Sequence, residues 1–278
     1  QTMKNVIITG CSSGIGYSAA CTLHAKGYNV LATTRKVIDA KPLQDLGIKC
    51  VTLDLNDSQS IIEAISYAND YFNGKIDALF NNAAYGQPGA VEDLKRSVLL
   101  EQFETNVFGT QELTNLVIAI MRKQGQGRII YNSSVLGIIS LPYRGAYNAS
   151  KYAIEGLADT LRLELFNTNI HISLIEPGPI TSQFRANAFS KFQQNINKKT
   201  SAHQHTYKGM EARLTKVGPA APFTLPPEAV TDKLLHAIES PRPKIRYYVT
   251  FPTYLLATLK RLLPHRCLDW VLRKVSDG

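Results

Sequence analysis

Asn5-Val-Ile-Ile-Thr-Gly-Cys-Ser-Ser-Gly-Ile-Gly16 stands close to the start of the chain. Its first half is a short apolar run typical of a buried strand, and a helical pattern continues from its second half to about Ala25. The glycines permit a tight turn and let the backbone approach a phosphate, which free N–H groups at the helix N-terminus can bind. A glycine triplet alone is weak evidence. Its place between a strand and a helix favours a dinucleotide-binding loop over a simple turn.

The same alternation of apolar runs and helical stretches continues along the chain. Strands are expected at 5–9, 29–33, 48–53, 76–81, 127–132, 170–175 and 245–250, and the longest helices at about 97–121 and 146–166. Strands alternating with helices predict a parallel sheet that is covered on both faces. We therefore expect an α/β fold: one Rossmann-type, doubly wound, seven-stranded domain over residues 1–250.

Two segments depart from this rhythm. Residues 182–223 are polar and weakly periodic, and a connection of this length in a compact domain is usually functional or mobile. Residues 251–278 form an amphipathic, basic extension in which Pro264 should break the helix. The extension could lie in a membrane interface, or it could pack on the domain or on a partner subunit.

The net charge of +9 is concentrated in these two segments. Residues 185–216 carry seven Lys or Arg against one acid, and the tail after Tyr254 adds five against two. No nucleic-acid-binding signature accompanies them, so nucleic acid is not expected as a partner. Four cysteines without CxxC pairing indicate reduced thiols and a cytoplasmic protein, and no metal site is expected. No apolar run reaches the 18 residues of a spanning helix.

The end of the second strand bears on the choice of cofactor. An NAD-binding loop would have Asp or Glu there to hold the ribose hydroxyls, but the sequence reads Thr33-Thr34-Arg35-Lys36 and has no acid before Asp39. The guanidinium of Arg35 suits a 2′-phosphate, and the hydroxyls of Ser12 and Ser13 face it on the glycine loop. These residues favour NADP(H); a solvated surface arginine is the alternative.

Tyr147 and Lys151 are four residues apart in a helical pattern and therefore share a face. A free tyrosine has a pKa near 10, and a neighbouring ammonium together with a cationic nicotinamide would lower that pKa. A Tyr-x-x-x-Lys pair is common on helix surfaces and means little without its context.

That context resembles the short-chain dehydrogenase/reductase family, in its single-domain branch. The motifs that carry the resemblance span nearly the whole chain to about Val249, in the family's order: Thr9–Gly16, Asn81-Asn82-Ala83, Asn106, Ser133-Ser134, Tyr147-Asn-Ala-Ser-Lys151 and Pro177-Gly178. The spacing to Tyr147 makes Ser134, rather than Ser133, the catalytic serine of the family's pattern.

The resemblance implies a catalytic tetrad of Asn106, Ser134, Tyr147 and Lys151. Tyr147 would exchange a proton with the substrate, Ser134 would hydrogen-bond its oxygen, and Lys151 would hold the nicotinamide ribose. Ala84 replaces a glycine of the family, which is tolerable if its φ is negative. The residues implied to bind the cofactor are Gly10, Ser12, Ser13, Gly14, Ile15, Gly16, Arg35, Asp54, Leu55, Asn82, Ala83, Ala84, Tyr147, Lys151, Pro177, Gly178, Ile180 and Ser182.

The substrate is expected to be a hydrophobic small molecule. By position, residues 182–223 would be a mobile lid, and Leu141, Tyr143 and Phe184 would form an apolar wall. The sequence is similar to bacterial NADP-dependent aldehyde reductases and to hydroxysteroid and retinol dehydrogenases, which implies aldehyde or ketone reduction. A retinol or steroid dehydrogenase and a non-catalytic NADP(H) sensor remain alternatives, although a sensor has no need of Tyr147. The family's long helices imply a homodimer or homotetramer.

Overall fold

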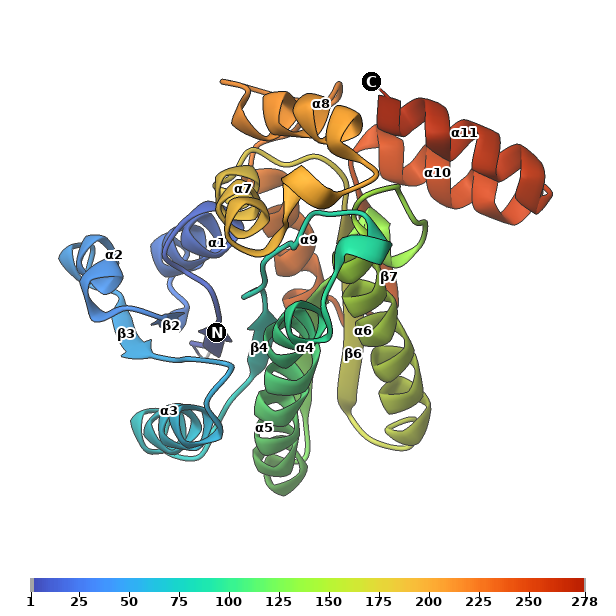
Figure 1. Ribbon diagram of the computed structural model, residues 1–278. Helices are drawn as coiled ribbons and strands as arrows, with labels where there is room; N and C mark the ends of the chain where they lie inside the picture. Colours follow the sequence, from blue (N-terminus) through green and yellow to red (C-terminus); the bar gives the residue numbers. More distant parts are fainter. Residues whose placement is uncertain (1–2, 278) are drawn as a thin grey trace.

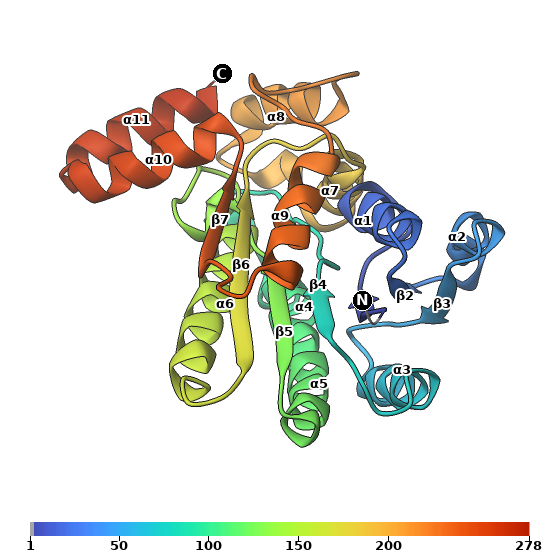
Figure 2. The ribbon, with the colours of Figure 1, turned by 180° about the vertical axis from the view of Figure 1, so that it is seen from behind.

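One parallel sheet of seven strands organises the chain, whose computed structural model describes residues 3–277. The strand order is β3-β2-β1-β4-β5-β6-β7, and helices cover both faces (Figures 1 and 2). The predicted Rossmann-type, doubly wound architecture is therefore confirmed. The strands are β1 (Asn5–Ile8), β2 (Asn29–Thr34), β3 (Lys49–Thr52), β4 (Ala78–Asn81), β5 (Gly127–Asn132), β6 (Ile170–Pro177) and β7 (Arg246–Val249).

The helices cover the two faces and the carboxyl end of the sheet (Figures 1 and 2). One face carries α1 (Gly14–Ala25), α2 (Lys41–Asp45) and α9 (Glu228–Glu239). The other carries α3 (Ser58–Tyr71), α5 (Thr110–Gln124) and α6 (Gly145–Glu164). Above the carboxyl ends lie α7 (Phe184–Asn195), α8 (Gln204–Thr215), α10 (Phe251–Leu262) and α11 (His265–Asp277).

Alternating side chains in the strands supply the two cores. Ile7 of β1 points into the core shared with α3, α5 and α6, whereas Val6 and Ile8 point into the core shared with α1 and α9. The period of two residues in a strand is the cause, and both sets are buried because the sheet is covered on both sides.

The long helix that we expected at 97–121 is interrupted, so that expectation is wrong in detail. It consists of α4 (Arg96–Phe103), a π-helical turn η3 (Glu104–Gly109) and α5. Gly109 lies so close to the carbonyl of Leu55 that a Cβ there would overlap the oxygen. A π turn widens the helix by one residue per turn, and here it contains Asn106.

The polar segment after β6 forms helices α7 and α8, joined by a short turn, η5 (Lys198–Thr200). Its weak periodicity hid them, but a separate small core holds them in place. Phe192 of α7 and Tyr207 and Met210 of α8 are buried against Leu94 and Val98, before and within α4.

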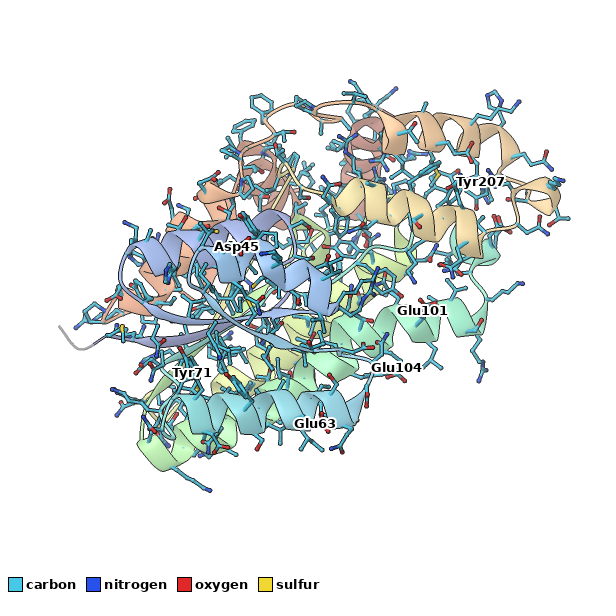
Figure 3. All side chains as sticks on the ribbon, turned by 90° about the vertical axis from the view of Figure 1, so that its left-hand side faces the viewer. Asp45, Glu63, Tyr71, Glu101, Glu104 and Tyr207 are labelled. Carbon is cyan, nitrogen blue, oxygen red and sulfur yellow. The ribbon has the colours of Figure 1, made fainter. Side chains whose placement is uncertain are left out.

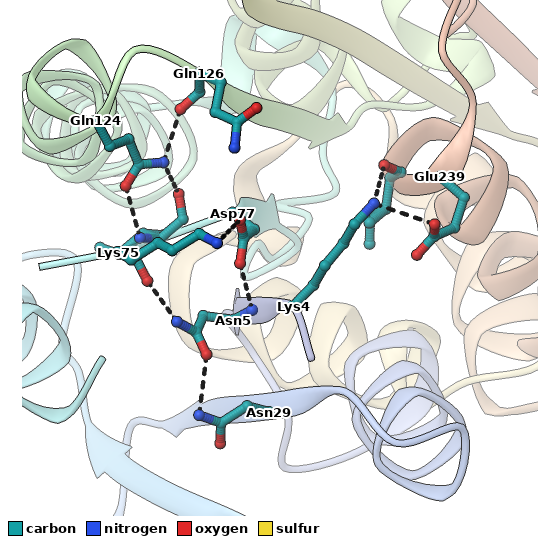
Figure 4. Close-up of polar contacts among 10 residues, drawn as sticks. Lys4, Asn5, Asn29, Lys75, Asp77, Gln124, Gln126 and Glu239 are labelled. Atoms are coloured by element: carbon teal, nitrogen blue, oxygen red, sulfur yellow. Dashed lines mark hydrogen bonds and ion pairs between the residues drawn. The ribbon is translucent and has the colours of Figure 1, made fainter. Parts of the chain in front are cut away.

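The amino ends of the strands are joined by polar contacts (Figure 4). The backbone N–H of Asn5 donates to Asp77 Oδ2 (2.7 Å), and its side-chain amide donates to the Lys75 carbonyl (2.7 Å). The Asn29 amide donates in turn to Asn5 Oδ1 (3.0 Å). These groups satisfy one another at this edge, which sets it apart from the carboxyl edge described below.

The C-terminal extension folds as a helical hairpin, and its break at Pro264 is confirmed. Leu256 of α10 and Leu268 and Leu272 of α11 are buried against Ile139 of the main domain. One face of the hairpin thus packs on the domain, as one of our alternatives held. Among the described residues, 3–277, no helix has both the length and the apolar character needed to cross a membrane.

Two helical glycines give a matched test of this packing. Gly109→Ala should lower the free energy of unfolding by about 1–3 kcal/mol, because its methyl group has no room beside Leu55. Gly156→Ala, on the exposed side of α6, should raise it by about 0.5–1 kcal/mol, because nothing lies within 4 Å of the new Cβ. Urea unfolding of both variants measures the difference; a Gly109→Ala variant as stable as the parent would contradict the close approach.

Candidate active site

The glycine loop after β1 presents an open helix N-terminus. Gly10 has a φ of +68°, and a Cβ there would lie 2.8 Å from the Cα of Ala83. Ser13 precedes α1 without capping it through its side chain, and the first turn of the helix contains no acid. Backbone donors and the helix dipole therefore favour an anion here. The predicted residues Ser12, Ile15 and Gly16 belong to the same loop and first turn.

The neighbouring strands end at the same edge. Arg35 directly follows β2 and is exposed. Asp54 and Leu55 follow β3; one Asp54 carboxylate oxygen accepts a hydrogen bond from the Asn56 N–H (2.9 Å), and Leu55 is buried. Because β3, β2 and β1 are adjacent and parallel, these residues lie beside the glycine loop along one edge.

Asn82 connects three strands. The N–H groups of Asn82 and Ala83 both donate to the Thr9 hydroxyl (3.0 Å each), and the Asn82 side chain donates to the Thr9 carbonyl (3.1 Å). Asn132 at the end of β5 donates to Asn82 Oδ1 (2.9 Å). Ala84 is not among the residues with positive φ, so the condition that we set for replacing the family's glycine is met.

The segment after β6 returns to the glycine loop. The Gly178 N–H donates to the Val249 carbonyl (3.0 Å), and Ile180 forms a β-bridge with Leu225. Ser182 lies next to Gly14, where an added Cβ would be 3.1 Å from the serine Cβ. The 177–182 segment predicted to contact the cofactor therefore adjoins the glycine loop.

Tyr147 and Lys151 lie on α6 next to the end of β5. The Lys151 ammonium donates to the Asn132 carbonyl (2.8 Å) and lies 5.6 Å from the centroid of the Tyr147 ring. Ser134, two residues beyond Asn132, is buried, and its hydroxyl accepts from the Leu136 N–H (3.1 Å). Three members of the predicted tetrad thus come together at the carboxyl edge.

Asn106, the fourth member, is buried in η3, and its side-chain amide forms three hydrogen bonds. It accepts from the Tyr85 N–H (3.1 Å) and donates to the Tyr85 carbonyl (2.9 Å) and to the Ser150 hydroxyl (3.1 Å). It therefore joins the π turn to the segment after β4 and to α6, one residue before Lys151.

Burial sets the protonation of the tyrosine and the lysine. It raises the pKa of Tyr147 to about 12, and the neighbouring Ser134 hydroxyl offsets this only in part. Burial also lowers the pKa of Lys151 to about 8, against the opposing effect of Glu155. The lowering of the tyrosine pKa that we expected is therefore not produced by the protein's own side chains, because desolvation outweighs them.

The segment that we expected to be a lid lies next to Tyr147. Phe184, at the first position of α7, packs edge-on against the Tyr147 ring with centroids 5.2 Å apart. Lys191 of α7 forms an ion pair with Glu101 of α4, and Tyr207 of α8 donates to Asp93; Figure 3 labels Glu101 and Tyr207. These contacts hold α7 and α8 over the carboxyl edge.

The apolar wall that we expected from Leu141, Tyr143 and Phe184 is not formed as one surface. Leu141 packs with the hairpin, and together with Tyr143 it lines a cavity of about 990 Å³ between the outer side of α6 and α11. Phe184 does not line this cavity, because it is turned toward Tyr147.

Charged residues that the sequence analysis missed lie directly behind Lys151. Glu155 of α6, Glu176 of β6 and Arg246 of β7 form a cluster in which both acids are buried. A signal was present in the sequence, because Glu176 interrupts the apolar run of β6 and Glu155 follows Lys151 by one helical turn.

Comparison with known proteins agrees with this geometry. A family profile described as short chain dehydrogenase matches residues 4–193. The chain belongs to this family. It is 41% identical to the uncharacterized oxidoreductase YbbO of Escherichia coli, over 97% of this chain and 94% of the relative. It is 32% identical to the NADPH-dependent 3-dehydrocapnine reductase of Ornithobacterium rhinotracheale, over 98% and 97%.

A solved short-chain dehydrogenase from Burkholderia phymatum, in complex with NAD, has the same fold. Its TM-score is 0.78 at 24% identity, and the alignment covers 99% of this chain and 97% of that one. The chain is therefore an oxidoreductase of the short-chain dehydrogenase family, whose members bind NAD(P).

Proposed function

We propose that the chain reduces an aldehyde or ketone of a hydrophobic substrate with NADPH. The observation that carries this proposal is that Tyr147, Lys151 and Ser134 lie together at the carboxyl edge of the sheet. The glycine loop and the N-terminus of α1, which no side chain caps, lie at the same edge. The apolar ring of Phe184 packs against Tyr147. An anion site next to a protonated phenol suits a dinucleotide and a carbonyl oxygen.

The side chains have separate tasks. A bound nicotinamide supplies the hydride for the carbonyl carbon. Tyr147, whose pKa of about 12 keeps it protonated, donates its phenolic proton to the carbonyl oxygen, so that an alcohol forms. Ser134 hydrogen-bonds that oxygen, and the Lys151 cation stabilises the phenolate until solvent returns the proton. Asn106 keeps η3 and the Tyr85 backbone in place.

NADP(H) is favoured over NAD(H) by the end of β2. Arg35 is exposed there, and the first acid after the strand is Asp39. A 2′-phosphate beside Arg35, Ser12 and Ser13 would find a cation and two hydroxyls, whereas a ribose diol would find no carboxylate. One relative is NADPH-dependent by name, and a structural neighbour was solved with NAD.

The substrate class follows from what surrounds Tyr147. Phe184 gives an apolar contact, which favours an aliphatic, aromatic, retinoid or steroid-like carbonyl over a sugar. The un-ionised state of Tyr147 suits proton donation and hence reduction; dehydrogenation of a retinol or steroid alcohol at the same site is the alternative. A non-catalytic sensor of NADP(H) would leave Tyr147 without a task.

We further infer a cytoplasmic homodimer or homotetramer. The four cysteines are free thiols, which fits a reducing compartment. Leu157, Leu163 and Phe166, on and just after α6, are exposed, and such apolar side chains on a long helix suit contact with a second subunit.

We also propose that residues 251–278 bring the enzyme to an anionic membrane surface. The lid segment 182–223 carries a formal charge of +6 and the extension +3, which together equal the +9 of the chain, so the remainder is neutral. Both segments lie at the carboxyl end of the sheet (Figures 1 and 2). Leu262 (74% exposed) and Trp270 (59% exposed) of the hairpin stand among Arg261, Arg266 and Lys274.

An anionic bilayer complements this surface better than a second subunit does, because two copies would bring like charges together. Exposed apolar side chains bordered by cations are typical of helices that lie in a membrane interface.

Tyr147→Phe should reduce turnover of carbonyl substrates at least about 100-fold while NADPH still binds, because only the proton donor is removed. NADPH oxidation over a panel of aliphatic, aromatic, retinoid and steroid carbonyls measures turnover, and nucleotide fluorescence measures binding. Tyr152→Phe is the matched control, because the Tyr152 hydroxyl on the same helix donates to the Ile138 carbonyl and its side chain is exposed. Turnover by Tyr147→Phe near that of the control would overturn the mechanism.

Arg35→Asp should reverse the preference for NADPH over NADH, because the charge that would meet the 2′-phosphate changes sign. The ratio of kcat/KM for the two nucleotides is the measurement. Lys244→Asp makes the same change of charge in an exposed loop before β7 and should leave the ratio as it was. An unchanged ratio in Arg35→Asp would exclude the phosphate assignment.

Vesicles test the membrane proposal. The chain should sediment with phosphatidylglycerol vesicles at low salt, and binding should weaken as salt rises. Arg266→Glu should weaken binding at least about fivefold, since each cation near such a surface contributes about 1 kcal/mol. Trp270→Ala should weaken it as well, whereas Phe166→Ala, remote from the hairpin and 83% exposed, should not. Absence of sedimentation at low salt would refute the proposal.

A further inference from the structure

The charged cluster behind Lys151 is built from three elements. Arg246 of β7 donates to Glu155 Oε2 (3.0 Å) and to Asp159 Oδ2 (2.8 Å) of α6. Its Nε lies 3.5 Å from Glu176 Oε2 of β6. Arg162 pairs with Asp159 on the solvent side. Glu155 is 7% exposed and Glu176 is entirely buried, so solvent screens neither acid well.

This cluster touches the catalytic segment directly. The Ser133 hydroxyl donates to Glu155 Oε1 (2.8 Å), and Ser133 immediately precedes Ser134. On the preceding turn of α6, Lys151 donates to the carbonyl of Asn132 (2.8 Å). Two residues of α6, one helical turn apart, therefore hold the chain just before Ser134.

The cluster has more acids than buried cations. Glu155, Asp159 and Glu176 share Arg246, while Arg162 serves only Asp159. Among residues 3–277, no N–H or O–H group donates a hydrogen bond to either carboxylate oxygen of Glu176, and an ionised carboxylate in that state is costly. Burial and the neighbouring Glu155 raise the pKa of Glu176 well above its ordinary value. A proton shared between these two carboxyls removes the excess negative charge.

We propose that Glu155 and Glu176, held by Arg246, form a proton-sharing pair that positions Ser134 and keeps Lys151 in its cationic form. Both are positioning residues, because neither would contact the substrate or the cofactor. The proposal rests on the proposed function for its kinetic consequences, but not for its effect on stability.

Glu155 and Glu176 affect the charge on Lys151 differently. The charge of Glu155 opposes the effect of burial on the pKa of Lys151. Glu176 is the protonated member and contributes no charge to the lysine. The other charged groups that face the pair are Asp159 and Arg162 of α6 and Arg246 of β7.

Stability gives a readout that needs no substrate. The pKa of Glu176 is raised on folding, so the folded state binds more protons than the unfolded state above pH 4.5 or so. Its contribution to stability therefore falls as pH rises from there toward the raised pKa. Glu176→Gln mimics the protonated acid, so its melting temperature should exceed that of the parent more at pH 8 than at pH 5.

Kinetics separate the two members. Glu155→Gln should shift the alkaline limb of kcat/KM to lower pH by about one unit, because Lys151 loses the charge that holds its proton. Glu176→Gln should keep the position of that limb. Glu164→Gln, at the exposed end of the same helix, should change neither the limb nor the pH dependence of melting.

The outcomes are distinct. A Glu176→Gln variant whose melting temperature follows pH exactly as the parent's does would overturn the shared proton, whether or not the parent reduces any carbonyl. An unshifted alkaline limb in a folded, active Glu155→Gln variant would overturn the link to Lys151. If Glu155→Gln fails to fold, Glu155→Asp is the substitute, because it keeps the carboxylate charge. This variant should fold and should show the alkaline limb at the pH of the parent. An alkaline limb of Glu155→Asp that moves to lower pH would refute the role of this charge in the protonation of Lys151. If the unmodified protein reduces no carbonyl, the proposed function is refuted, but the melting temperatures of Glu176→Gln still test the shared proton.

Discussion

A run of three hydrogen bonds crosses the carboxyl edge of the sheet and ties the helix that carries Tyr147 to the glycine loop. The Lys151 ammonium donates to the Asn132 carbonyl, Asn132 donates to Asn82, and Asn82 donates to the carbonyl of Thr9. Each bond joins a different pair of elements: α6 with β5, β5 with β4, and β4 with β1. Tyr147, Lys151 and the glycine loop therefore share one frame, and moving any of these strands displaces all of them.

This frame is maintained at a cost in stability. Among the described residues, the buried side-chain oxygens without a hydrogen-bond partner belong to Asn81, Asn132, Asn148 and Glu176. Asn81, Asn132 and Glu176 stand at the carboxyl ends of β4, β5 and β6, and Asn148 in the first turn of α6. Such an oxygen costs about 1–3 kcal/mol. None of these oxygens within residues 3–277 lies at the amino edge, so the cost is confined to the edge at which we place the chemistry.

The sheet, and the meeting of Ser134, Tyr147 and Lys151 at its carboxyl edge, could be predicted because local patterns encode them. Apolar runs located all seven strands, and the order of motifs brought Ser134, Tyr147 and Lys151 to one place. Other features depend on contacts between distant segments. The π turn at Asn106 accompanies the close approach of Gly109 to Leu55, and α7 and α8 depend on a core shared with Leu94 and Val98. The pKa of Tyr147 depends on burial by Phe184 and its surroundings, which spacing does not reveal. The catalytic roles of the tetrad and the roles of the individual cofactor residues stay predictions.

Arg246 lies on β7, the last strand of the sheet and the last to leave the ribosome during synthesis. Until β7 pairs with β6, the acids of α6 and β6 lack the cation that they share. We therefore expect a nascent chain that ends before residue 246 to hold its sheet edge open and its catalytic segment loose, since unpaired buried acids resist packing. The charged cluster behind Lys151 would then be completed only after β7 has been synthesised and has paired with β6.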